Sequence, residues 1–238
     1  MVFVKFANKI GLGGETQLLR WVDYEDDAKR KSEDLEKKIA EANKVLLLVH
    51  GIIGDTEEMA KTFRIARDKG YDLVLTYDYE NLNTPIEENA RILKEKLLKA
   101  GFGKVDGKEL VLVVHSMGGL VSRYMIERLG GDEFVDKLIM AGTPNGGSKF
   151  GDVPGYVNWA SVLLGLGTKI FPPQIGAVTG FLSGFLKGTN AVLFKALSQM
   201  SSDDEFIKGL NAGNPPPISY VVFGGDLNTY LTANDGIA

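Results

Sequence analysis

A serine with two glycines shortly after it follows a buried apolar run near the middle of the chain. The segment LVVHSMGGL sets Ser116 between the apolar run Leu110–Val114 and the helical pattern Met117–Leu129. A serine on a sharp strand-to-helix turn stands above the sheet, and Gly118 and Gly119 allow the two backbones to approach closely. The N-terminus of the following helix would point at an oxyanion formed there. The pattern therefore predicts a nucleophilic serine.

The composition narrows the chemistry further. The 238 residues include no Cys, which excludes disulfides, cysteine-based zinc sites and thiol nucleophiles. Only two His are present, too few for a site with several imidazole ligands. The 27 Lys and Arg against 31 Asp and Glu give a net charge of −4, without the basic excess that nucleic-acid binding needs. We expect no metal, no cofactor and no nucleic-acid partner.

Apolar runs alternate with helical patterns over most of the chain. Strands are expected at residues 45–49, 73–77, 110–114, 134–141 and 217–223. Helices are expected from Asp55, from the capping box of Thr84, Pro85 and Glu87, at 117–129 and at 203–210. Strand-helix units in series imply right-handed crossovers. The fold class is thus α/β, with a mostly parallel central sheet and helices on both faces.

Residues 1–44 precede this alternation. Two short apolar runs, Val2–Ala7 and Gln17–Val22, are separated by a glycine-rich stretch and predict a pair of antiparallel strands. Charged residues dominate from Asp23 to Glu41, with one thin apolar stripe at helical spacing. We interpret this part as a solvated helix that leads to the next strand.

These residues resemble the α/β-hydrolase superfamily, and within it the microbial lipases and the lecithin-cholesterol acyltransferase-like esterases. The resemblance runs from about Val45 to the end of the chain. It implies that the sequence HGI at residues 50–52 is the oxyanion loop, so that the N–H groups of Ile52 and Met117 form the oxyanion hole. It also implies that Asp235 is the acid of the triad, with Asp226 as the alternative.

The base of such a triad is missing. In this superfamily the histidine follows the acid, but only Gly, Ile and Ala follow Asp235. His115 adjoins the nucleophile and His50 lies in the oxyanion loop, and for both we expect structural roles. We expect the chain to be truncated, with the base, the last strand and the final helix beyond Ala238. The alternative is a catalytically silent relative that binds a lipid or a protein partner.

An apolar insertion occupies residues 150–200, where lipases carry a lid. Glycines and the pair Pro172-Pro173 interrupt it, so it does not form one membrane-spanning helix. A cover of this kind would line an acyl pocket and could open onto a lipid surface. Its predicted substrate-binding residues are Trp159, Leu163, Phe171, Phe181 and Phe185. The alternative is a fixed apolar cap that completes the core.

The sequence thus predicts a single α/β-hydrolase domain over residues 1–238 that acts as a serine carboxylester hydrolase. The expected substrate is a small-molecule ester or a lipid, and the lid could make transient contact with a membrane surface. Hydrolysis and acyl transfer to another acceptor use the same residues. The first residues carry no signal-peptide pattern, so a cytoplasmic location is expected.

Overall fold

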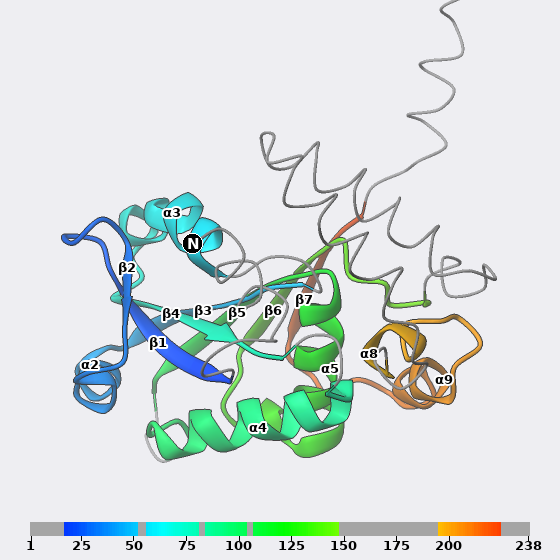
Figure 1. Ribbon diagram of the computed structural model, residues 1–238. Coiled ribbons are helices and arrows are strands. Elements are labelled where there is room, and N and C mark those ends of the chain that lie inside the picture. Colours follow the sequence, from blue (N-terminus) through cyan, green and yellow to red (C-terminus); the bar gives the residue numbers. More distant parts are fainter. Residues whose placement is uncertain (1–16, 52–55, 81–83, 104–106, 148–194, 225–238) are drawn as a thin grey trace, which may run out of the picture.

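The computed structural model describes residues 17–51, 56–80, 84–103, 107–147 and 195–224. In this part of the chain seven strands form one sheet, in the order β2-β1-β4-β3-β5-β6-β7 (Figure 1). The strands are β1 (Leu18–Asp23), β2 (Lys29–Lys31), β3 (Lys44–Val49), β4 (Leu73–Asp78), β5 (Glu109–His115), β6 (Lys137–Ala141) and β7 (Ser219–Phe223). The α-helices are α2 (Leu35–Glu41), α3 (Thr56–Thr62), α4 (Ile86–Lys99), α5 (Met117–Leu129), α8 (Lys195–Ser198) and α9 (Glu205–Asn211). Two 3-10 helices are η1 (Phe63–Lys69) and η2 (Gly131–Glu133).

The sheet is mostly parallel, as predicted. Strands β4, β3, β5, β6 and β7 pair in parallel, whereas β1 is antiparallel to β4 and β2 is antiparallel to β1. The chain runs outward from β3 to β4 and then returns past β3 to β5. The order of the strands therefore reverses between β3 and β5. In open α/β sheets, ligands bind beyond the carboxyl ends of the strands at such a point.

Helices cover both faces of the sheet, which confirms the predicted layers. In β3, Val45, Leu47 and Val49 belong to the apolar cluster that includes α4, α5 and α9. The alternate residues Leu46 and Leu48 belong to a second cluster with α3 and η1. A strand whose two faces are both buried reads as a continuous apolar run, which is why the sequence revealed it. In Figure 1, α4 and α5 lie on one side of the sheet and α3 on the other.

The interpretation of residues 23–41 as one helix is wrong. A turn follows β1, in which Asp27 and Ala28 have φ angles of 49° and 58°. Such positive φ values are incompatible with a continuous helix. The chain then returns as β2 beside β1, and only Leu35–Glu41 is helical. Ion pairs explain why so charged a segment forms a strand, since Lys31 Nζ lies 2.7 Å from Asp23 Oδ2.

The expected capping box at the start of α4 is not formed. Pro85 occupies the N-cap position, and no side chain from the cap accepts a hydrogen bond. The N–H of Ile86 instead donates to Gln199 Oε1 at 2.9 Å, and Gln199 comes from the segment just after α8. The side-chain amide of Gln199, which is distant in sequence, therefore caps the helix in place of Thr84 and Glu87.

The other predicted elements that the structure describes are present, with small shifts at their ends. The expected strand at 134–141 begins only at Lys137, because η2 ends at Glu133. Residues 117–129 form α5 as predicted. The predicted strand Val2–Ala7, the helix start at Asp55 and nearly all of the insertion at 150–200 lie outside the described residues.

Candidate active site

Ser116 occupies the tight turn between β5 and α5, as the sequence predicted. Its backbone angles are φ 51° and ψ −124°, which L-residues rarely adopt. The serine N–H donates to the Ala141 carbonyl of β6 at 2.9 Å, so the turn is fixed to the neighbouring strand. Strained backbone angles of this kind persist only where the surrounding structure imposes them, and they cluster at functional sites. The turn places Ser116 at the carboxyl edge of the sheet.

Glycines on both sides of the turn allow this approach. A Cβ on Gly51 would stand 2.8 Å from Ser116 Cβ and 2.9 Å from His115 Nδ1. A Cβ on Gly118 would overlap the carbonyl oxygen of His50, and one on Gly119 would overlap the Thr143 side chain. The segment after β3 thus lies directly against the nucleophile turn.

The first N–H groups of α5 follow Ser116 directly. The first four N–H groups of a helix have no partner within the helix. Ser116 O accepts a hydrogen bond from Gly119 N–H at 3.0 Å. The N–H of Met117 stands at the first helical position. The Met117 side chain is fully buried in the core and anchors this backbone. The helix dipole adds a favourable field for a negative charge at the turn.

His50 has a structural role, as the sequence analysis expected. Its Nδ1 lies 2.6 Å from Gly51 O, and its Nε2 accepts a hydrogen bond from Tyr79 N–H at 3.3 Å. The imidazole stacks on the Tyr79 ring, with centroids 4.5 Å apart, and only 4% of the residue is exposed. Both ring nitrogens are therefore occupied, which argues against His50 as the catalytic base.

His115 precedes the nucleophile at the end of β5. Its Nδ1 lies against Gly51, and the side chain is largely covered. Burial lowers the pKa of His115 below its ordinary value, and His50 contributes in the same direction. The imidazole is therefore neutral at pH 7, and it lies next to Ser116 in sequence and close to Gly51.

Asp78, at the carboxyl end of β4, forms ion pairs and hydrogen bonds with residues near His50. It pairs with Arg20 of β1, with Arg30 of β2 at 2.9 Å, and with the N–H and hydroxyl of Thr56 at 2.9 and 2.8 Å. Burial acts to raise the pKa of Asp78, but His50, the two arginines and the Thr56 N–H outweigh it, so the net pKa is lowered. The sequence analysis did not single out this carboxylate, although its place at a strand end was a usable signal.

The structure tests only part of the predicted site. Ser116 and Met117 lie together at the turn. Outside the described residues are Ile52, Asp235, Asp226, Trp159, Leu163, Phe171, Phe181 and Phe185. Within the described residues, no three His, Asp or Glu side chains are placed to hold a metal ion. No helix in that part of the chain is long and apolar enough to cross a membrane.

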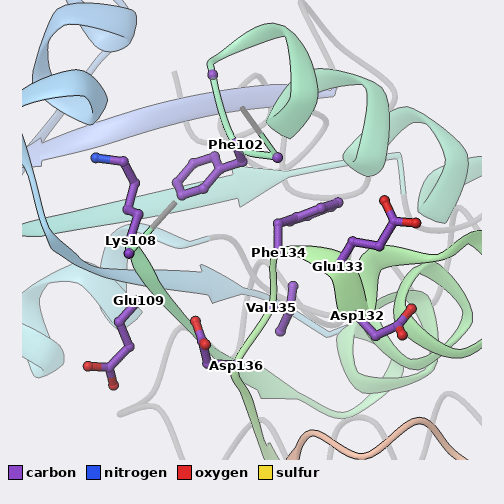
Figure 2. Close-up of a pocket in the computed structure, with 11 residues that line it drawn as sticks. Phe102, Lys108, Glu109, Asp132, Glu133, Phe134, Val135 and Asp136 are labelled. Carbon is purple, nitrogen blue, oxygen red and sulfur yellow. The ribbon is translucent and has the colours of Figure 1, made fainter. Parts of the chain in front are cut away.

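A hollow of about 360 Å³ lies at the opposite edge of the sheet, where β5 and β6 begin (Figure 2). Two of its charged side chains hold neighbouring backbone groups. Lys108 Nζ donates to Ile39 O at 2.6 Å, and Asp136 accepts from Leu110 N–H at 2.7 Å. Because it opens at the amino ends of the strands, it takes no part in chemistry at Ser116.

Several solved structures are similar to this chain. The mature form of the lipase BlEst2 from Bacillus licheniformis is 20% identical over 93% of this chain and 81% of that chain, with a TM-score of 0.56. Its propeptide form is 18% identical over 88% of this chain and 39% of that chain, with a TM-score of 0.54. A carboxylesterase structure from the thaumarchaeon Nitrososphaera gargenis is 14% identical over 82% and 90% of the two chains, with a TM-score of 0.48.

The chain has the α/β-hydrolase fold, which the sheet order, the covering helices and the serine turn define together with the two BlEst2 structures. It belongs to the family described as domain of unknown function DUF7379, whose model matches residues 14–235. No curated protein matches the chain significantly.

Proposed function

We propose that this protein is a serine hydrolase that cleaves carboxylic esters, with Ser116 as the nucleophile. The observation that carries the proposal is the backbone of Ser116, held at φ 51° between a buried strand and a helix N-terminus. A serine used only for packing has no need of such strain. The fold that the chain shares with the lipase BlEst2 supports the same reaction class.

The reaction follows from the groups at the turn. Ser116 Oγ attacks the ester carbonyl carbon, its proton passes to a base, and the carbonyl oxygen becomes an oxyanion beside the Met117 N–H. Collapse of this intermediate releases the alcohol and leaves an acyl group on Ser116. Water then attacks the acyl-enzyme and releases the acid. His50 is not expected to be that base, because both of its ring nitrogens face backbone groups of Gly51 and Tyr79.

The remaining parts of the proposal come from the sequence. Asp235 would orient the base, and Ile52 would supply the second oxyanion donor. The preference for lipid or long acyl esters rests on the apolar insertion at 150–200, whose large side chains are suited to an acyl chain.

The proposal is tested by covalent labelling of the full-length protein. A fluorophosphonate probe should label the wild type, and Ser116→Ala should abolish the labelling, because the probe reacts with an activated serine hydroxyl. Ser122→Ala is the matched control, since Ser122 is a fully buried serine on the same helix. This variant should label like the wild type.

Hydrolysis of nitrophenyl esters of increasing chain length measures turnover. Rates should depend on Ser116 and rise with acyl length over the short esters. Labelling that persists in Ser116→Ala, or equal loss in both serine variants, contradicts the assignment of the nucleophile. Absence of labelling in the wild type, together with lipid binding that Ser116→Ala leaves unchanged, would identify a binding protein instead.

A further inference from the structure

The segment after β3 packs directly on the nucleophile turn. The carbonyl oxygens of Val49 and His50 lie against Gly118, and Gly51 lies against Ser116 Cβ. Space for even one extra methyl group is lacking at either glycine. The position of the His50-Gly51 peptide therefore sets the shape of the site around Ser116.

Tyr79 holds this peptide through three contacts. Its hydroxyl donates to His50 O at 2.9 Å, its N–H donates to His50 Nε2 at 3.3 Å, and its ring stacks on the imidazole. Only 3% of Tyr79 is exposed. Burial raises the pKa of Tyr79 well above its ordinary value, so the hydroxyl remains a donor at every working pH.

The carboxyl end of β4 also holds the residue at which α3 begins. Asp78 accepts hydrogen bonds from both the N–H and the hydroxyl of Thr56. Two consecutive residues, Asp78 and Tyr79, thus fix Thr56 and His50, which flank the chain between β3 and α3. Because β4 is paired with β3 from Leu73 to Tyr77, the strand that ends at Asp78 and leads into Tyr79 is fixed beside β3.

We propose that Tyr79 is a positioning residue that fixes the His50-Gly51 peptide against the Ser116 turn. It touches no reacting atom and acts through His50. The proposed consequence for catalysis rests on the proposed ester hydrolysis, whereas the positioning itself does not. Misplacement of a reactive group by a fraction of an ångström slows the chemical step more than it weakens substrate binding.

The test compares Tyr79→Phe with Tyr77→Phe. Tyr77 is a fully buried tyrosine in β4, two residues before Tyr79, and its hydroxyl donates to Gln17 and to Asn89 O rather than to His50. Each variant loses one buried hydroxyl and keeps its ring, so their melting temperatures should fall by similar amounts. Only Tyr79→Phe should lower kcat for a nitrophenyl ester, by about tenfold, with KM unchanged. Tyr79→Leu, which also removes the stacking, should be slower still.

A second measurement does not depend on turnover. Backbone amide resonances of Gly51 and Gly118 should move in Tyr79→Phe and stay in place in Tyr77→Phe. Equal kcat values for the two Phe variants, or amide resonances of Gly51 and Gly118 that remain at their wild-type positions in Tyr79→Phe, overturn the inference. If the wild type shows no turnover that depends on Ser116, the proposed function is refuted but the role of Tyr79 is not. The amide resonances would then decide the role of Tyr79.

Discussion

Single backbone positions define the geometry of the candidate site. The strain at Ser116 costs about 1–3 kcal/mol and is held by the hydrogen bond to Ala141 and by the close contact of Gly51 and Gly118. The contacts at Gly118 are with main-chain atoms of Val49 and His50, so side-chain repacking cannot relieve them. Glycine at residues 51 and 118 is therefore a steric requirement of the turn.

Gly118→Ala should damage both folding and reactivity. Alanine favours a helix, but its Cβ would overlap the backbone oxygens of Val49 and His50. We expect a loss of about 2 kcal/mol in the free energy of unfolding and slower fluorophosphonate labelling of Ser116. Urea denaturation and labelling kinetics measure the two effects.

The control is Gly209→Ala, on the helix α9. A Cβ there has nothing within 4 Å, so the variant should be more stable by about 0.5–1 kcal/mol. Labelling at the wild-type rate in Gly118→Ala would show that the close contact does not shape the site.

At the scale of elements, contacts between distant segments decide where helices begin. Helix α4 starts where Gln199 caps the Ile86 N–H and also donates to Glu87. The sequence pattern of Thr84 and Glu87 suggested a local cap, but the Thr84 N–H donates to Glu80 instead. The Gln199 side chain, 113 residues away in sequence from Ile86, therefore connects the segment after α8 to the start of α4.

Replacement of Gln199 should separate these two explanations. Gln199→Leu leaves the buried Ile86 N–H without its acceptor and should cost about 1–2 kcal/mol in the free energy of unfolding. Thr84→Ala should change it by less than about 0.5 kcal/mol. Urea denaturation of both variants is the measurement, and a larger loss in Thr84→Ala would restore the local cap.

At the scale of the molecule, a nearly buried charge cluster joins the N-terminal strands to the parallel sheet. Asp78 on β4 binds Arg20 of β1 and Arg30 of β2, and the Asp78 side chain is 17% exposed. Removal of one partner from such a cluster leaves charges buried without compensation. The N-terminal strands are therefore part of the same folding unit as the site.

Asp78→Asn should reduce the free energy of unfolding by about 3 kcal/mol at pH 7. The folded pKa of Asp78 is lowered from its ordinary value of 3.8, so the carboxylate stabilises the fold fully above that value. As the pH falls through the folded pKa, this contribution is lost, and the difference between wild type and variant should shrink below about pH 4. Thermal melts from pH 2 to 8 give the profile.

Glu88→Gln serves as the control, because Glu88 pairs with Arg91 on the exposed face of α4. Its effect should be small and should vanish at high salt, whereas that of Asp78→Asn should persist. A difference between wild type and Asp78→Asn that stays constant down to pH 2 would contradict the assignment of the carboxylate.

Elements that depend on a local apolar pattern could be predicted from the sequence. Elements that depend on contacts between distant segments could not. The strands at 45–49 and 110–114 and the helix at 117–129 were predictable because burial on both faces leaves an uninterrupted apolar run. Residues 23–41 were not, because their strand depends on ion pairs with β1 and β4. Charged side chains read as solvent-exposed until their partners are known.

The sequence by itself determined the class of fold and the nucleophile turn, because an apolar strand, a serine and two glycines are consecutive and act through local backbone geometry. Only the tertiary structure decided what holds that turn. Tyr79 reaches His50 across 29 residues of sequence, and His50 in turn meets Gly118. Such contacts arise from strand order in the sheet, which no local pattern of residues encodes.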